Sequence, residues 1–225
     1  MNNLLAFFSS SIGRKVLIAI TGLLLVLFLI AHLIGNLLSF LGPDSLNSYA
    51  AALKGNPALL WSARIGLLTV FVLHLMNALA LAMQNRAARG VQYQNKGYMA
   101  ATAASRTMVI TGLVVLLYVA YHLSHFTLGL TNPDHFSMHD AQGRHDVYGM
   151  ILHGFQIPVV AWGYVAAMLV VAYHLSHGIQ SSLQTFGLRN ENYTPCVKQF
   201  SVFLALLLCL GFSSIPLAVQ FGLVG

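Results

Sequence analysis

The chain has 225 residues, of which 57% are hydrophobic and only 7% are charged. Soluble domains carry about 25% charged residues, so this composition excludes an ordinary soluble domain and indicates a membrane protein. The net charge of +6 does not indicate nucleic-acid binding, because the basic residues lie between apolar runs rather than on one solvated face. The two cysteines, Cys196 and Cys209, form no C-x-x-C-H motif, which excludes covalent haem attachment.

Five apolar runs are each long enough to cross a bilayer as a helix. They predict transmembrane helices at about 14–41, 59–84, 105–131, 150–183 and 197–222, all within one domain covering 1–225. The first run is too long for a cleavable signal sequence, and a serine cluster before it is suited to capping a helix. We expect a short amphipathic helix between the first two spans and a kink near the start of the fourth, at Pro158. The predicted fold is an all-α integral membrane bundle of five helices.

The distribution of basic residues predicts how the bundle is oriented, because cytoplasmic connections are enriched in Lys and Arg. With a cytoplasmic N-terminus, the inner segments hold Arg14, Lys15, Arg86, Arg89, Lys96, Arg106, Arg189 and Lys198. The outer segments hold only Lys54, Arg64 and Arg144, beside Asp44, Asp134, Asp140 and Asp146. We therefore predict that the N-terminus is cytoplasmic and that the C-terminus is outside.

Each of the first four predicted spans carries a histidine inside its apolar run, namely His32, His74, His122 and His174. The last two open the doubled phrase His-Leu-Ser-His, preceded each time by tyrosine. An ionisable side chain in the bilayer core is costly unless it meets a partner, so such residues indicate a functional site.

Counting along the helices sorts these histidines into two layers. His32 and His122 each lie eleven residues before a proline at the outer end of a span, a depth of roughly 16 Å. His74 and His174 lie seventeen and sixteen residues after the prolines that begin their spans, a depth of roughly 25 Å. Each layer thus offers two imidazoles on different helices at matched height.

Two imidazoles at one height are what a bis-histidine haem requires, since its axial ligands approach a flat macrocycle from opposite faces. Such an iron has no open position and carries electrons rather than binding oxygen. The pattern therefore predicts two haems stacked across the bundle. Three alternatives stay open: single helix-to-helix hydrogen bonds, a zinc site, and a haem-free transporter whose histidines relay protons.

The second histidines of the doubled phrase, His125 and His177, lie three residues after His122 and His174 and share nearly the same helix face. Because only the first histidine of each phrase matches the layers, the second ones are not expected to bind iron. They could instead bond a haem propionate or a quinone oxygen, or join two helices by a hydrogen bond.

Haem propionates are anionic and need cations or hydroxyl donors near the membrane surface. The candidates are Arg106 with Ser105 at the inner end of the third span, Arg64 at the outer end of the second, and Arg14 with Lys15, for which topological anchoring is the favoured role. Four residues nearer the outer surface are candidate quinone contacts: Asn36, Trp61, Arg64 and His153. The loop histidines at positions 135, 139 and 145 are expected to be solvated, although protonation or adventitious metal binding is an alternative.

Several short segments together resemble one family. They are Ser11-Ile12-Gly13-Arg14-Lys15, His32-Leu33-Ile34-Gly35-Asn36, Tyr173-His174 with Gly178, Asp146-Val147-Tyr148, Gln184-Thr185-Phe186-Gly187 and Ile215-Pro216. In order and spacing the chain resembles the five-helix, di-haem cytochrome b membrane subunit of bacterial succinate:quinone oxidoreductases, which include quinol:fumarate reductases.

The resemblance implies that two non-covalent b haems are bound in the bacterial cytoplasmic membrane. His32 and His122 would be the axial ligands of the outer, distal haem, and His74 and His174 those of the inner, proximal haem. It also implies a flavoprotein subunit with the dicarboxylate site, an iron–sulfur subunit on the cytoplasmic face, and a quinone, usually menaquinone, that reacts near the distal haem. The alternative is a di-haem cytochrome b anchor of a hydrogenase or formate dehydrogenase, which would bind the same haems but a different catalytic subunit.

Two departures from the family concern proton handling. Some relatives carry an acid in the loop after the first span, where this chain has Leu53-Lys54-Gly55-Asn56. Some carry a glutamate two residues before the fourth-span ligand, where this chain has Ala172. His125, His153 or the loop histidines are candidate substitutes for these acids.

Overall fold

The computed structural model describes residues 2–88, 102–188 and 190–224, so the basic residues Arg89, Lys96 and Arg189 lie outside the described part. The described helices are α1 (Asn2–Ser9), α2 (Ser11–Leu37), α3 (Pro43–Lys54), α4 (Pro57–Ala87), α5 (Ala103–Phe126), α6 (Pro133–Phe136), α7 (Val147–Gln156), α8 (Pro158–Thr185) and α9 (Thr194–Gln220), with a 3₁₀ turn, η1, at Leu38–Leu41.

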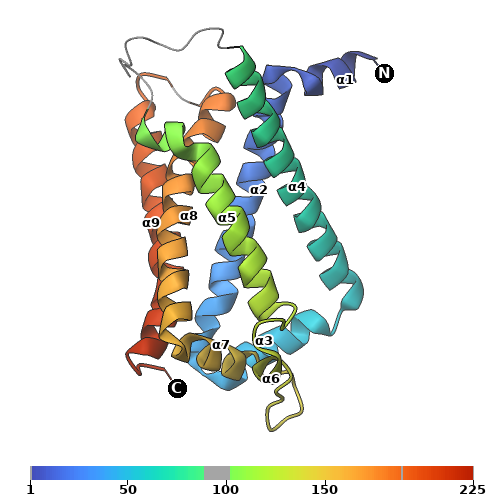
Figure 1. The fold of residues 1–225 in the computed structure, drawn as a ribbon, viewed down its shortest axis with the longest axis vertical. Helices are drawn as coiled ribbons and strands as arrows, with labels where there is room; N and C mark the ends of the chain where they lie inside the picture. The colour runs from blue at the N-terminus through green and yellow to red at the C-terminus, as the bar shows by residue number, and fades with distance from the viewer. Residues whose placement is uncertain (1, 89–101, 189, 225) are drawn as a thin grey trace.

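Five of these helices are long and apolar enough to cross a membrane: α2 continued by η1, α4, α5, α8 and α9. The prediction of a five-span, all-helical membrane bundle is thus confirmed for the described residues. Because the number of spans is odd, the N-terminal helix and the C-terminus lie at opposite ends of the bundle (Figure 1). Which end faces the cytoplasm stays a prediction.

The spans do not pack equally. α8 packs most extensively against α9, and α2 contacts α4, α8 and α9. α5 contacts α8, whereas α4 contacts mainly α2 and lies at the edge of the bundle (Figure 1). α2, α4, α5 and α8 therefore surround the central part of the bundle, and α9 closes it on one side.

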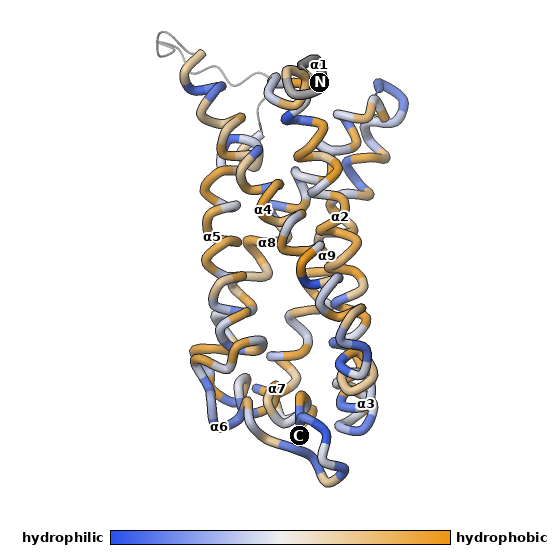
Figure 2. The backbone as a smooth tube through the Cα atoms, turned by 90° about the vertical axis from the view of Figure 1, so that its right-hand side faces the viewer, coloured by the Kyte–Doolittle hydropathy of each residue, from blue (hydrophilic) through white to orange (hydrophobic). Residues whose placement is uncertain are grey.

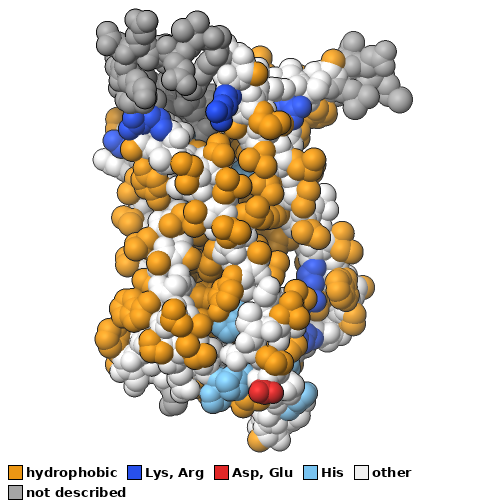
Figure 3. Space-filling view, viewed as in Figure 1, with side chains coloured by type: hydrophobic (Ala, Val, Ile, Leu, Met, Phe, Trp, Pro, Cys, Tyr) orange, Lys and Arg blue, Asp and Glu red, His pale blue; other side chains and the backbone are white. Residues whose placement is uncertain are grey.

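The hydropathy of the backbone follows the expected membrane pattern. Apolar residues dominate the middle of the helices, and polar residues concentrate at both ends (Figure 2). On the surface, many Lys and Arg side chains lie near the end that holds the N-terminus, while acidic and His side chains show near the opposite end (Figure 3). We name the N-terminal end the inner end and the opposite one the outer end, following the predicted orientation.

Local sequence signals explain where the spans begin. The Ser10 side chain accepts a hydrogen bond from the Gly13 N–H at 3.1 Å and caps α2, as Asn56 caps α4 and Thr102 caps α5. These side chains satisfy backbone N–H groups that have no partner inside the helix. The predicted cap and the short helix after the first span are both present.

Two boundaries differ from the sequence prediction. Pro158 does not kink a continuous span: α7 ends at Gln156, Ile157 is extended with φ −79° and ψ 110°, and Pro158 begins α8. Proline disfavours a helical residue before it and suits a first turn, so it separates two helices here. The third span ends at Phe126 rather than near 131, because Gly129 adopts a positive φ of 66° and turns the chain.

A polar clamp holds α3 against the loop before α7 at the outer end. Asn47, only 1% exposed, donates hydrogen bonds to Asp140 at 3.3 Å and to Asp146 at 2.9 Å, and accepts one from the Tyr148 N–H. Arg144 pairs with Asp140 at 2.7 Å and with Asp44 on α3 at 2.9 Å. The clamp, defined here as these groups, covers the outer end of the bundle.

Candidate functional site

The two histidines predicted for the outer layer meet between α2 and α5. The ring centres of His32 and His122 lie 5.9 Å apart with their planes 84° from parallel. Phe28 stacks on His32 at 5.2 Å, and Tyr118 lies 5.9 Å from His122. The Nδ1 atom of His122 is buried and has no hydrogen-bond partner among the residues that the structure describes. An unpaired buried imidazole nitrogen is uncommon and requires an explanation, of which a bound cofactor is one.

The two histidines predicted for the inner layer come from α4 and α8. His74 and His174 lie close enough to interact electrostatically. Each imidazole also lies within hydrogen-bond distance of a threonine on a neighbouring span. Thr21 Oγ1 on α2 lies 3.1 Å from His74 Nδ1, and Thr111 Oγ1 on α5 lies 3.1 Å from His174 Nδ1.

Each layer offers two imidazoles from different spans, which is the donor set that a bis-histidine haem requires. Two imidazoles that bind one metal through nitrogen bonds of about 2 Å have ring centres about 6 Å apart, which matches the separation of His32 and His122. In the inner layer, a Cβ added to Gly22 would lie 3.2 Å from His74, and one added to Gly112 would lie 3.3 Å from His174. These glycines therefore let the two imidazole rings lie close against the backbones of α2 and α5. No three His, Cys, Asp or Glu residues in the described chain are grouped to hold a metal ion by themselves.

His125 lies one helical turn beyond His122 and interacts with it electrostatically. It is 2% exposed, stacks on Phe126 with ring centres 4.0 Å apart, and hydrogen-bonds the Tyr164 hydroxyl on α8 through Nδ1 at 3.2 Å. Of the roles considered for it, the structure contains the helix-to-helix hydrogen bond. His177 lies near His174 and interacts with it electrostatically.

The candidate partners of haem propionates are distributed over both ends. Ser105 lies in the first turn of α5, where its N–H bonds the Thr102 cap, and Arg106 beside it is exposed. At the outer end, the Arg64 guanidinium lies 5.2 Å from the centre of the Trp61 ring. Burial, and then the charge of Arg64, lower the pKa of the Lys54 ammonium. Two cations thus lie near each other at the outer end, where an anionic group would be stabilised.

The four candidate quinone contacts do not form one cluster. The Asn36 amide donates to the His32 carbonyl at 2.7 Å. Trp61 and Arg64 lie together on α4, and His153 on α7 stacks on His135 at 4.4 Å. Within the described residues, no hydrogen bond or ring contact joins these three places. A quinone contact at any of them stays a prediction.

The family model for the succinate dehydrogenase/fumarate reductase transmembrane subunit matches residues 83–212, which is more than half of the chain. The chain belongs to this family. It is therefore a multi-pass membrane subunit of a succinate dehydrogenase or fumarate reductase complex, an oxidoreductase. Neither the comparison with curated proteins nor that with solved structures gave a match.

The family assignment confirms the resemblance at its coarser level. The matched region contains His122 and His174, whereas His32 and His74 precede it. The five-helix, di-haem type, the axial ligands and the quinone chemistry stay predictions for this member of the succinate dehydrogenase/fumarate reductase transmembrane subunit family.

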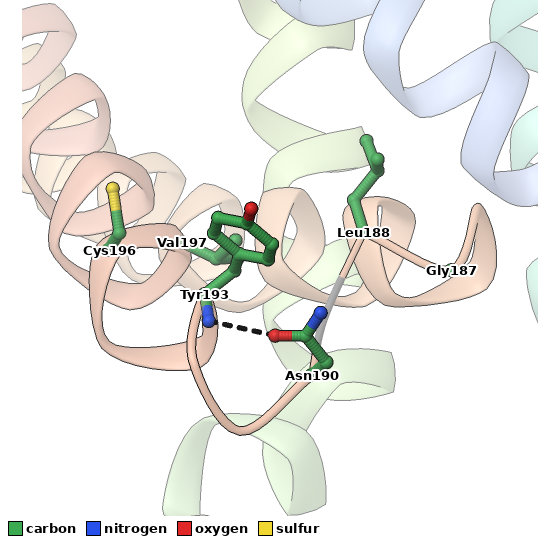
Figure 4. Close-up of a pocket in the computed structure, with 6 residues that line it drawn as sticks. All are labelled: Gly187, Leu188, Asn190, Tyr193, Cys196 and Val197. Carbon is green, nitrogen blue, oxygen red and sulfur yellow. Dashed lines mark hydrogen bonds between the residues drawn. The ribbon is translucent and has the colours of Figure 1, made fainter.

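A surface hollow at the inner end is a poor candidate for the site of this family member. It is lined by Gly187, Leu188, Asn190, Tyr193, Cys196 and Val197, and the Asn190 side chain accepts a hydrogen bond from the Tyr193 N–H (Figure 4). The hollow begins thirteen residues after His174, roughly 20 Å along the helix. It contains none of the candidate ligands.

Sequence reasoning missed Thr21 and Thr111. A signal for them exists, because each is the second residue of the tetrapeptide Ile-Thr-Gly-Leu, and each lies eleven residues before an outer-layer histidine. The doubled phrase is thus not the only repeat: α2 and α5 share a longer pattern that runs from Ile-Thr-Gly-Leu to His-Leu.

Proposed function

We propose that this subunit carries electrons between an iron–sulfur partner on the cytoplasmic face and a membrane quinone, through two bis-histidine b haems. The observation that carries the proposal is the pairing of histidines from alternate spans: α2 with α5 in the outer layer and α4 with α8 in the inner layer. When bound, such haems supply one-electron transfer without an open iron position.

The chain's own residues would hold and shield these groups. His32 and His122 would ligate at the outer layer, and His74 and His174 at the inner one. The surrounding apolar side chains exclude water, and the four spans fix the height of each imidazole. Quinone, with menaquinone as the first candidate, would react near the outer layer; Arg64 and Lys54 lie close together farther out, at the outer end of the bundle.

The proposed partners are an iron–sulfur subunit and a flavoprotein that carries the dicarboxylate site. The basic side chains of the inner connections, such as Arg86 and Arg106, would meet the iron–sulfur subunit. The location would be the bacterial cytoplasmic membrane. The family match supports a complex of several subunits.

The test is the haem-to-chain stoichiometry of the purified complex, together with its reduced-minus-oxidised visible spectrum. We expect two b haems per chain, the alpha band of low-spin haem, and a flavin-containing subunit that co-purifies. A complex with one haem or none would refute the two-layer proposal. Two haems with a hydrogenase or formate dehydrogenase partner would refute the assigned reaction.

A further inference from the structure

The two inner-layer histidines share an arrangement that the outer-layer histidines lack. Each is met by the threonine of an Ile-Thr-Gly-Leu segment on the span beside it, with an Oγ1–Nδ1 distance of 3.1 Å in both cases. The segments belong to α2 and α5, whose own histidines form the outer layer. Each of these two spans therefore contributes a ligand candidate to one layer and a hydroxyl group to the other.

The direction of these hydrogen bonds follows from the single proton of a hydroxyl group. Thr21 Oγ1 donates to the Leu17 carbonyl at 2.6 Å, and Thr111 Oγ1 donates to the carbonyls of Thr107 and Met108 at 3.2 and 3.1 Å. With that proton committed, the oxygen can only accept from the imidazole, so Nδ1 carries the hydrogen. Nε2 is then unprotonated and keeps its lone pair, and an imidazole binds a metal through such a nitrogen.

The glycine after each threonine serves the same ring. A Cβ on Gly22 would lie 3.2 Å from Cε1 of His74, and one on Gly112 would lie 3.3 Å from Cε1 of His174. In each Thr-Gly pair, the threonine hydroxyl therefore orients the imidazole. The glycine, which has no side chain, leaves room for the edge of the ring.

The outer layer has a different environment. In the described part of the chain, the buried Nδ1 of His122 has no hydrogen-bond partner. The group beside His32 is the Asn36 amide nitrogen, 3.3 Å from Nδ1 and 3.4 Å from Nε2, and an amide nitrogen donates rather than accepts. Among the described residues, only the inner layer has a hydroxyl acceptor on both of its histidines.

We propose that Thr21 and Thr111 are positioning residues of the inner haem: they fix the tautomer of His74 and His174 and lower the reduction potential of the iron that these histidines hold. An acceptor on Nδ1–H makes the imidazole a stronger electron donor, which stabilises the oxidised iron. The inference rests on the proposed function, since it presumes a haem at this layer.

The experiment is an equilibrium redox titration of the purified complex carrying Thr21→Val or Thr111→Val. Valine keeps the shape and removes the acceptor. Both variants should retain two haems and raise the midpoint potential of the inner haem. The expected change in the reduction equilibrium is on the order of tenfold, which corresponds to about 59 mV for one electron. The Ile18 carbonyl also faces His74 and would remain an acceptor there, so the shift should be larger for Thr111→Val.

A matched control lies one turn away on α5. Thr107 bonds the carbonyls of Ala103 and Ala104, so Thr107→Val should leave both potentials as in the wild type. Thr111→Ser restores the hydroxyl and should restore the potential. The shifted haem is assigned by comparison with His74→Ala and His32→Ala, which are expected to remove the inner and the outer haem respectively.

The possible outcomes separate the two proposals. A wild-type complex without bis-histidine haem refutes the proposed function itself. A wild-type complex with two haems, in which Thr21→Val and Thr111→Val behave like Thr107→Val or shift the outer haem, refutes only the positioning role. If a valine variant loses a haem, loss of the inner one supports the role and loss of the outer one overturns it.

Discussion

Nδ1 of His125 on α5 lies 3.2 Å from the hydroxyl oxygen of Tyr164 on α8. Both residues are buried, and Tyr164 also faces Tyr118, Phe126 and Phe155 with ring centres 5.0–5.7 Å away. The pair thus joins two spans by one polar contact inside an aromatic cluster. A buried polar contact of this kind gives His125 a structural role that does not require iron.

The first prediction concerns this pair. His125→Ala leaves the Tyr164 hydroxyl buried without its partner, so the complex should lose about 1–3 kcal/mol of stability but keep both haems. Thermal unfolding and the haem-to-chain ratio measure the two effects. His122→Ala, three residues earlier on the same helix, should instead remove the outer haem. The assignment of ligands is wrong if His125→Ala loses a haem and His122→Ala loses none.

The second prediction addresses the two layers directly. His32→Ala and His74→Ala should each reduce the haem content from two to one, because each removes one axial ligand of a different pair. The two variants should lose haems that differ in midpoint potential. His139→Ala, in the exposed loop, is the control that should keep both haems. Loss of the same haem in both variants would mean that His32 and His74 share one iron.

The spans and the histidine pairs could be predicted because both depend on regular geometry. A charge-free run of hydrocarbon length predicts a helix, and a constant rise per residue converts sequence position into depth. Counting from the ends of the spans brought His32 to the height of His122, and the structure brings these residues together. The count needed no knowledge of side-chain contacts.

The remaining features depend on contacts that span the sequence. A threonine in a membrane helix ordinarily bonds a backbone carbonyl one turn earlier in its own helix. Thr21 therefore gave no reason to expect a contact with His74, 53 residues later. Asn47 donates a hydrogen bond to Asp146, 99 residues later, and no local sequence pattern predicts this contact. The early end of α5 depends on Gly129, a weaker signal than the proline that follows it.

The third prediction concerns the outer clamp. Asn47→Ala leaves two carboxylates and the Tyr148 N–H without their buried partner, so opening of the 134–146 loop should become easier by about 1–3 kcal/mol. Trypsin cleavage after Arg144 should accelerate by roughly an order of magnitude or more, since 1.4 kcal/mol is about tenfold. Asn77→Ala is the matched control, because its amide bonds the Leu73 carbonyl of its own helix and no other described residue. Equal cleavage rates in both variants would contradict the clamp.

The fourth prediction is the pH dependence of the clamp. Burial alone would raise the pKa of Asp140, but hydrogen bonds from the Arg144 guanidinium and from the N–H groups of Arg144 and Gln142 outweigh it and hold that pKa below its usual value. A carboxyl group with a lowered folded-state pKa stabilises the loop fully above its ordinary pKa, and this stabilisation is lost as the pH falls through the lowered value.

Pepsin, which acts in acid, can measure this change in the 134–146 loop. Between pH 5 and pH 2, loop cleavage in the wild type should rise toward that of Asp140→Asn, which lacks the charge at every pH. The ratio of the two rates should therefore approach one at the acid end. A constant ratio across this range would show that protonation of Asp140 does not open the loop.

The fifth prediction tests the orientation with a membrane-impermeant thiol reagent. The positive-inside count assigns the 134–146 loop to the outside and the connection before α9 to the cytoplasm. In a Cys196→Ser background, which removes the exposed native thiol, Ser137→Cys should react in intact cells. Glu191→Cys should react only after the cells are opened, and detergent-solubilised complex shows that both thiols are reactive. Cys209 is buried and should not contribute. The reverse labelling pattern would invert the bundle and would move the His32–His122 layer to the cytoplasmic half, away from the side where quinone chemistry is proposed.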